Sequence, residues 1–180
     1  MIKKFQKLGF KISYDEVRKV AKGEIGRPHI AKVILKNNPD KISSFDEIFD
    51  RYLAVGKKAY VEREEKISVR QAIKAVHAAK GLAFIAHPGV YDFDVEKFIL
   101  YFKRNKGDGI ETIYNYTKSR RKATKKINYG INKKFKDIAK KYELLETGGS
   151  DFHGEHSHIL GDLEVPYSVL DALKKQRISR

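Results

Sequence analysis

The 180-residue chain contains no cysteine, and this absence limits both its covalent and its metal chemistry. Without thiols it forms no disulfides and no thiolate metal sites, so any metal must be held by His, Asp and Glu. The sequence also lacks the run of about eighteen apolar residues that a membrane-spanning helix needs. Its basic start, residues 1–7, lacks the apolar stretch of a signal peptide. These absences together predict a cytoplasmic protein that does not span a membrane.

Acidic residues are few compared with basic ones. The 23 Asp and Glu residues face 38 Lys and Arg residues, which gives a formal net charge of +15. Such a charge favours polyanionic partners such as nucleic acid or nucleotides. A solvated, lysine-rich surface of the kind found on many thermophile proteins has the same composition. Residues 118–141 are the densest basic segment, and we expect an outer helix that faces water, with a phosphate-tracking face as the alternative.

The sequence has no internal repeat and no low-complexity tract, and its length suits one domain with a small subdomain. The first part, up to residue 66, is expected to be helical and irregular, without a clear strand. Ser44 and Glu47 have the spacing of a capping box at a helix start. The helices expected in this part are Tyr14–Ala21, Pro28–Lys36 and Ser44–Leu53.

From residue 67 the pattern changes to alternating helix and strand. Ser68 and Gln71 form a second capping box, and the helix that they open should stop near Gly81. Alternation of this kind predicts parallel strands joined by crossover helices, as in part of a β/α barrel or in a small open sheet. The expected strands are Leu82–Ala86, Gly109–Tyr114 and 144–147, and the expected helices are 94–104, 118–141 with a break near Gly130, and one after Pro166.

Candidate metal ligands follow two of the expected strands. Asp151 and His153 lie in the segment Gly148–Gly154, and their spacing points both side chains the same way on extended backbone. His87 follows the strand that ends at Ala86, a position where barrel enzymes place ligands. A carboxylate with imidazoles suits a divalent metal such as zinc, manganese or iron. The simpler alternative is a turn aspartate with loop or core histidines.

Other polar residues are expected to play smaller parts. Glu111 lies on a strand and is expected to point outward, with a role as a further ligand as the alternative. His156 and His158 share a polar loop, where exposed imidazoles that bind no metal are expected. His77 lies inside a helix, as a packing or surface residue.

Arg27 and His29 stand at the start of a predicted helix, in the segment Gly26–Ala31. A cationic and an imidazole side chain beside free helix N–H groups make a phosphate-binding site. The alternative is a loop arginine that pairs with a carboxylate.

At these residues the chain resembles the PHP superfamily, the polymerase and histidinol phosphatase metal-dependent phosphoesterases. The subgroup that it resembles contains nucleoside 3′,5′-bisphosphate phosphatases and a related 5′-trimming ribonuclease. The order and spacing of the motifs match nearly the full length. These motifs are Gly26–Ala31, Phe49–Leu53, Ala59–Val61, Ala86–Pro88, Gly109–Glu111, Gly149–Gly154, Leu160–Gly161 and Val165–Pro166.

The resemblance implies an α/β fold, a distorted seven-stranded β/α barrel with a helical insertion. Residues 1–66 would be the insertion, and residues 67–180 the C-terminal part of the barrel. His87, Asp151 and His153 would be metal ligands, while Arg27 and His29 would face the substrate phosphate. The implied substrate is a nucleotide or a short oligonucleotide.

The chain departs from the family pattern at its beginning. The family starts with a strand that carries His-x-His, and no His-x-His precedes residue 29 here. About three of the expected ligands remain, so we expect a phosphoesterase that is incomplete or inactive as this chain alone. Whether the chain is an enzyme by itself therefore stays open. The alternatives are a basic, non-catalytic nucleic-acid-binding protein, or half of a split enzyme in which a separate chain supplies the first strands.

Overall fold

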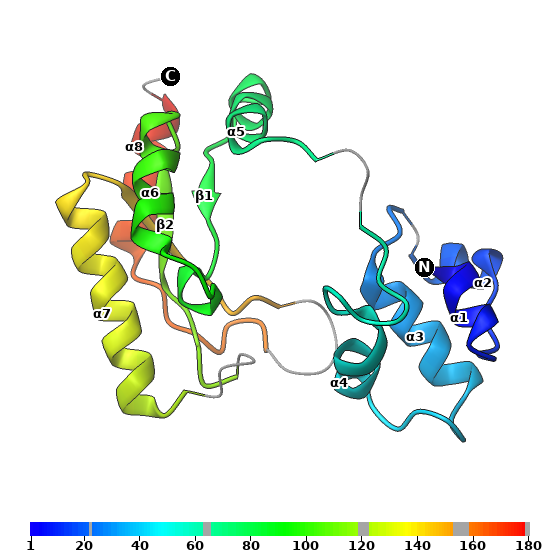
Figure 1. Ribbon diagram of the computed structural model, residues 1–180. Coiled ribbons are helices and arrows are strands. Elements are labelled where there is room, and N and C mark those ends of the chain that lie inside the picture. Colours follow the sequence, from blue (N-terminus) through cyan, green and yellow to red (C-terminus); the bar gives the residue numbers. More distant parts are fainter. Residues whose placement is uncertain (22, 63–65, 119–122, 153–158, 179–180) are drawn as a thin grey trace. The chain divides into compact units, whose positions relative to one another are not determined.

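The computed structural model describes residues 1–21, 23–62, 66–118, 123–152 and 159–178. They form two compact units, Met1–Lys66 and Ile67–Arg180 (Figure 1). Each unit has a hydrophobic core of its own. Across these described ranges, no helix combines the length and the apolar character that crossing a bilayer demands.

The N-terminal unit packs short helices around an aromatic centre. The rings of Phe5 and Phe10 meet edge-on at 5.3 Å between centroids, and Phe10 meets Tyr52 in the same way at 5.1 Å. Edge-to-face packing of this kind adds to the stabilisation from burial. The first helix was not expected from the sequence. The elements are α1 (Ile2–Lys7), α2 (Tyr14–Ala21), α3 (Arg27–Asn37), α4 (Phe45–Ile48) and the π-helix η1 (Phe49–Leu53).

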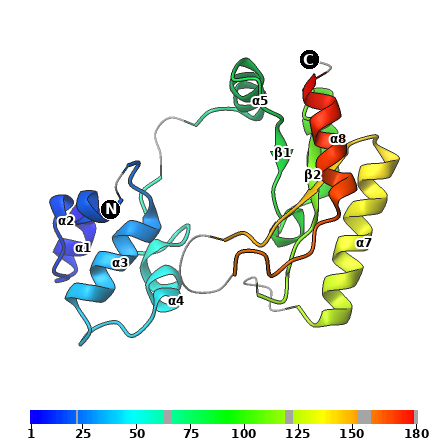
Figure 2. The same ribbon diagram turned by 180° about the vertical axis from the view of Figure 1, so that it is seen from behind.

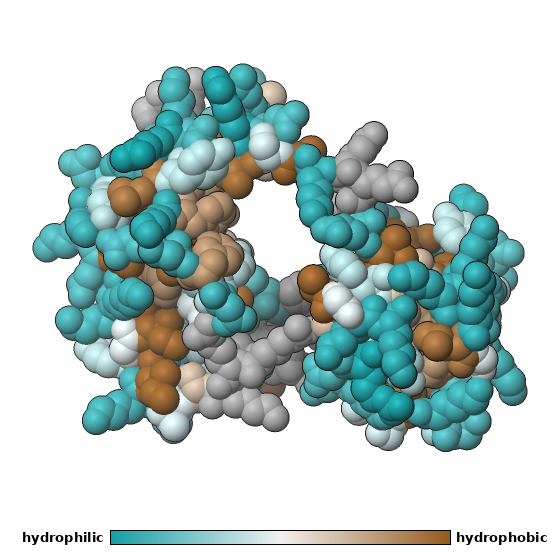
Figure 3. All heavy atoms as spheres, in the orientation of Figure 1, coloured by the Kyte–Doolittle hydropathy of each residue, from teal (hydrophilic) through white to brown (hydrophobic). Residues whose placement is uncertain are grey.

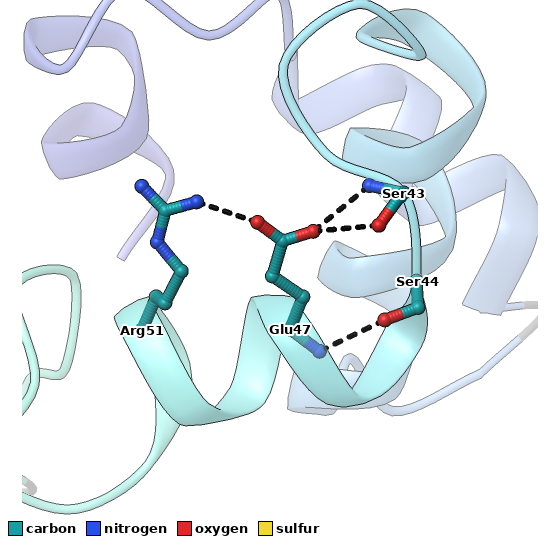
Figure 4. A network of polar contacts seen from close by, with 4 residues as sticks. All are labelled: Ser43, Ser44, Glu47 and Arg51. Carbon is teal, nitrogen blue, oxygen red and sulfur yellow. Dashed lines mark hydrogen bonds and ion pairs between the residues drawn. The ribbon is translucent and has the colours of Figure 1, made fainter.

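The segment that begins at Ser44 starts as predicted but does not stay one α-helix. The Ser44 hydroxyl accepts a hydrogen bond from the Glu47 N–H at 3.2 Å (Figure 4). The Glu47 carboxylate accepts from the N–H and hydroxyl of Ser43, one residue earlier than a capping box places it, and pairs with Arg51. From Phe49 the α-helix becomes the wider π-helix η1. The Ala54 N–H donates to the Phe49 carbonyl at 2.8 Å, five residues earlier, which is the spacing of a π-helix.

In the C-terminal unit, helices alternate with the strands of a parallel sheet. Within the described residues the sheet has three strands in the order β1-β2-β3 (Figure 2). This confirms the α/β class with parallel strands. The elements are α5 (Val69–Ala78), β1 (Phe84–Ile85), the 3₁₀ turn η2 (Pro88–Val90), α6 (Val95–Arg104), β2 (Gly109–Ile113), α7 (Lys125–Lys141), β3 (Leu145–Gly148) and α8 (Tyr167–Ile178).

The two faces of the sheet have different surroundings. Strand order follows chain order, so the crossover helices α6 and α7 cover the same face. Ile85 and Ile110 lie on that face and are buried in a core with side chains of both helices. The opposite face carries Phe84, Glu111 and Ile113, which are only partly buried. The sheet therefore holds polar chemistry on the face turned away from its helices.

Two helix boundaries test the sequence analysis. The Ser68–Gln71 capping box is present, with its two bonds at 3.2 Å and 2.8 Å. The basic helix α7 begins at Lys125, later than the predicted residue 118, because Thr124 caps it. The predicted break near Gly130 is wrong, because α7 runs through this residue without interruption.

Candidate functional site

Polar side chains gather where the three strands end. His87 follows β1, Glu111 is the middle residue of β2, and Asp151 follows β3. His87 and Asp151 both adopt left-handed backbone, with φ of 32° and 55°. Such conformations cost a non-glycine residue about 1–3 kcal/mol and cluster at functional sites. Parallel strands bring these ends to one edge of the sheet, the edge that commonly carries ligand sites in α/β folds.

His87 is held by a hydrogen bond of its backbone N–H. Its N–H donates to a carboxylate oxygen of Glu111 at 2.5 Å. Its Nδ1 is buried and has no hydrogen-bond partner among the residues that the structure describes. A buried polar atom without a partner costs about 1–3 kcal/mol, so this nitrogen suits a ligand such as a metal ion.

Tyr114 connects His87 with Asp151. Its hydroxyl donates to Asp151 Oδ2 at 3.2 Å, and its ring lies 5.5 Å from the His87 ring between centroids. Burial, followed by the charge of Asp151, raises the pKa of the Tyr114 hydroxyl. Tyr114 therefore remains a neutral donor that holds the Asp151 carboxylate in place at neutral pH.

From the sequence, the Glu111 side chain is expected to point outward, and the structure shows that this expectation is wrong. Its carboxylate turns toward the loop after β1 and accepts the His87 N–H. Burial is the main cause that raises the pKa of Glu111 to about 7; the hydrogen bond from His87 opposes this rise and the charge of Asp151 adds to it. Glu111 thus supports His87 and belongs to the candidate site.

The structure brings two of the three predicted ligands to one place. His87 and Asp151 both contact Tyr114. His153 lies outside the described residues, as do His156 and His158. Over the part of the chain that is described, no group of three or more His, Cys, Asp or Glu side chains gathers to hold a metal ion. The three-ligand centre stays a prediction.

Arg27 and His29 lie at the start of α3, in the N-terminal unit. Arg27 Nη1 donates to the Leu53 carbonyl at 3.2 Å, and the guanidinium lies 5.9 Å from the centre of the Phe49 ring. His29 Nδ1 accepts the Gly26 N–H at 3.0 Å and so closes the first turn of the helix. The alternative in the sequence analysis was that Arg27 pairs with a carboxylate, but the hydrogen bond found here has a backbone carbonyl as acceptor. Arg27 is exposed, with further guanidinium donors beyond this bond.

Sequence reasoning missed a polar network at the opposite, amino end of the strands. The Asp108 side chain is 2% exposed, and its Oδ2 lies 2.8 Å from His77 Nε2 and accepts the Ala83 N–H at 2.6 Å. This carboxylate ties α5 and β1 to the start of β2. His77 is thus a partly buried structural residue, as its place inside a helix indicated, but its partner is distant in sequence.

Comparison with known proteins finds relatives of this chain. No family model matches the chain. A 5′-3′ exoribonuclease of Haemophilus influenzae is 35% identical over 154 residues, which are 83% of this chain and 51% of that protein. A 3′,5′-nucleoside bisphosphate phosphatase of Chromobacterium violaceum is 31% identical over 145 residues, 78% of this chain and 46% of that protein. The chain spans about half the length of the curated relatives that it matches.

Two solved structures share the fold of this chain. An amidohydrolase from Chromobacterium violaceum, determined with bound sulfate and no metal, matches 97% of this chain and 60% of its own, with a TM-score of 0.77 and 25% identity. The chain is a relative of the PHP-like phosphoesterases. A Bifidobacterium adolescentis protein assigned as a metal-dependent phosphoesterase has the same fold, with a TM-score of 0.75 over 99% of this chain and 63% of its own, at 24% identity. The PHP resemblance of the sequence motifs is thereby confirmed.

Proposed function

We propose that this chain takes part in the metal-dependent hydrolysis of a phosphoester in a nucleotide or a short oligonucleotide. The observation that carries the proposal is the meeting of His87 and Asp151 around Tyr114, at the carboxyl edge of the sheet. The buried Nδ1 of His87 supports it, because this atom has no hydrogen-bond partner among the described residues and imidazole nitrogen is a common metal ligand. The names of the relatives, an exoribonuclease and a bisphosphate phosphatase, support the same class of reaction.

The proposed metal ligands are His87, Asp151 and His153, for manganese, zinc or iron. A bound divalent metal would supply an activated water and neutralise phosphate charge. The protein's own part is positional. Glu111 holds the His87 backbone, and the Tyr114 hydroxyl holds the Asp151 carboxylate. An imidazole nitrogen and a carboxylate oxygen are donors that all three metals accept.

Arg27 and His29 are proposed to bind a second phosphate of the substrate. The first turn of α3 offers N–H groups and the positive end of a helix dipole, both of which favour an anion. The Nδ1 bond of His29 to Gly26 leaves the other ring nitrogen of the imidazole to contact a ligand. Arg27, which is exposed, can present a planar pair of donors to phosphate oxygens.

We also propose that turnover needs ligands beyond these residues. Hydrolysis requires an activated water and charge neutralisation together, and the described residues include no cluster of three metal-binding side chains. The missing donors would come from a segment that carries His-x-His, in the same chain or in a second chain. That segment would add strands to the sheet and complete a seven-stranded barrel, with residues 1–66 as its helical insertion.

Phosphate release from a nucleoside 3′,5′-bisphosphate with manganese tests this proposal. We expect little or no turnover by the 180-residue chain alone. Adding the His-x-His segment, fused or as a separate chain, should restore turnover that a chelator abolishes. Robust chelator-sensitive turnover by the chain alone would contradict the need for further ligands. A completed protein that still releases no phosphate would contradict the hydrolytic role itself.

A second function, non-catalytic binding of nucleic acid, has its own supporting observation. The chain carries a net charge of +15. Helix α7 exposes seven lysines, and Asp137 is its one acidic residue. Such a face attracts a phosphate backbone without any metal. The lysines are Lys125, Lys126, Lys133, Lys134, Lys136, Lys140 and Lys141.

A further inference from the structure

Two aromatic rings stack in the loop between η2 and α6. Tyr91 and Phe93 lie 5.1 Å apart between centroids, with 17° between their planes. Tyr91 is partly buried against the hydrophobic core of its unit, whereas Phe93 is 54% exposed and lies outside the set of residues that pack on this core. An aromatic side chain that leaves more than half of its surface in water contributes little to the core and has area to offer a ligand.

The stack begins at the candidate site. The Tyr91 ring lies 6.2 Å from the His87 ring between centroids. Burial, and after it the charge of Glu111, raises the pKa of the Tyr91 hydroxyl. Three neighbouring rings thus connect the carboxyl edge of the sheet, where the phosphate is proposed to bind, with an exposed ring. In order they are His87, Tyr91 and Phe93.

The exposed ring is held in a fixed orientation. Phe98, on α6, meets Phe93 edge-on at 5.6 Å and 86°, while Tyr91 covers Phe93 as a stacked ring. A ring that is already oriented loses little conformational freedom when a ligand binds. Flat ligands with a π-system gain most from such a surface, and every nucleobase has one.

We propose that Phe93, supported by Tyr91, is a stacking site for the nucleobase of the substrate. This inference rests on the proposed function, since it assigns the base of the nucleotide whose phosphate the His87 and Asp151 edge would handle. Stacking on a single ring contacts the flat face of a base, which all bases share. The site therefore predicts a preference for nucleotides over sugar phosphates, with little selection among bases.

The variant Phe93→Trp gives a direct readout, because the chain contains no tryptophan and the new indole is its sole one. In the presence of manganese, adenosine 3′,5′-bisphosphate should quench the indole fluorescence, whereas the same sugar bisphosphate without a base should not. Tyr101→Trp is the matched control. Tyr101 is 47% exposed and lies near the end of α6, the end that leads into the start of β2 and away from the carboxyl edge. Its indole should respond to neither ligand.

Affinity provides the second readout. Calorimetry should find that Phe93→Ala weakens binding of the bisphosphate with a base about tenfold, which is about 1.4 kcal/mol, and leaves the sugar bisphosphate unchanged, because only the first ligand has a base to stack. A circular-dichroism melt confirms that the variant is folded. If the original chain binds both ligands equally, the stacking site is wrong while the phosphate site stands. If it binds neither, the proposed function fails and this inference fails with it.

Discussion

Asp151 has a left-handed backbone, with φ of 55°, directly after β3. Tyr114, whose ring lies 5.5 Å from the His87 ring between centroids, donates from its hydroxyl to the Asp151 carboxylate. We predict that Asp151→Ala lowers the manganese or zinc bound per chain by at least about tenfold in affinity, since losing a charged ligand costs more than about 1.4 kcal/mol. Elemental analysis after dialysis against the metal measures it. Asp171→Ala, at an exposed position of α8, is the control. Equal metal content in both variants would exclude Asp151 as a ligand.

Glu111 gives a pH dependence whose sign is fixed by its environment. Its pKa rises from 4.5 to about 7 on folding, so the folded state binds a proton more tightly than the unfolded state. The contribution of Glu111 to stability is therefore complete below about pH 4.5 and is lost as the pH rises through 7. The full shift corresponds to about 3 kcal/mol. Because Glu111 is only partly buried, we expect about 1–2 kcal/mol after solvent screening.

Denaturant unfolding of the metal-free chain in chelator, at pH 5 and pH 8, measures this effect. Glu111→Gln keeps an oxygen that can accept the His87 N–H but does not titrate, so it is the reference. The original chain should lose about 1–2 kcal/mol relative to Glu111→Gln between the two pH values. A difference between the two proteins that is the same at both pH values would refute the raised pKa.

Residue identity alone predicted where the polar groups lie but only partly which way they point. His87 and Asp151 were expected at strand ends, and the structure places them there. The two-residue period of a strand puts Glu111 on the face opposite Ile110, but it cannot tell whether that face meets solvent or a site. Asp108 gave no signal, because its partners Ala83 and His77 lie 25 and 31 residues away.

At the level of elements, two glycines differ in whether the structure has room for a side chain at their position. An added Cβ at Gly130, inside α7, meets nothing within 4 Å, so Gly130→Ala should stabilise the chain by about 0.5–1 kcal/mol. At Gly109, on β2, an added Cβ lies 2.3 Å from the Leu145 carbonyl and 2.3 Å from the Phe84 ring. Gly109→Ala should therefore destabilise by at least about 1–3 kcal/mol. Thermal and denaturant unfolding measure both. Changes of the same sign in the two variants would contradict this account.

Local signals predicted the helices that carry a cap and missed features that depend on packing. Ser68, with Gln71, fixes the start of α5 through bonds within four residues, so the sequence contains the whole cause. The short α1 has no side-chain cap and is held by the burial of Phe5, which comes from distant residues. The widening of the chain into η1 after α4 likewise has no local signal. Gly130 suggested a break, but packing of Phe135 and Ile138 keeps α7 continuous.

The order of helices and strands in the sequence predicted the type of sheet but not the number of its strands. Alternation of helix and strand from residue 67 predicted the parallel sheet, because crossover connections allow few other arrangements. The described residues form three strands in chain order, which fits part of a barrel and a small open sheet equally well. Strand number depends on how the sheet edges are covered, a property of the assembled molecule that no single segment encodes.

At the scale of the whole molecule, the two proposed functions differ in how binding depends on salt and on the metal. The coloured residues of the face drawn in Figure 3 are mostly hydrophilic, and the net charge of +15 attracts any polyanion. We predict that the affinity for a short single-stranded RNA falls steeply with salt, with a slope of about −0.7 per phosphate contacted. A nucleoside 3′,5′-bisphosphate has few charges, so under the proposed function we expect its binding to depend on the metal and on Arg27 and His29. Chelator at constant salt should weaken it at least about tenfold.

Fluorescence anisotropy with labelled RNA and calorimetry with the bisphosphate measure the two affinities, each with manganese and then with chelator. Arg27→Ala should weaken the bisphosphate without changing the metal content, because Arg27 offers donors to phosphate and no lone pair to a cation. Lys136→Ala, an exposed position on α7, is the control of equal charge change and should leave the bisphosphate unaffected. If chelator changes neither affinity while salt abolishes both, the chain is a basic binding protein and the hydrolytic proposal is wrong. If chelator lowers the affinity for the bisphosphate and salt mainly lowers the affinity for RNA, the two ligands are bound by different means. The metal at the carboxyl edge of the sheet then binds the bisphosphate, and the lysines of the surface bind the RNA.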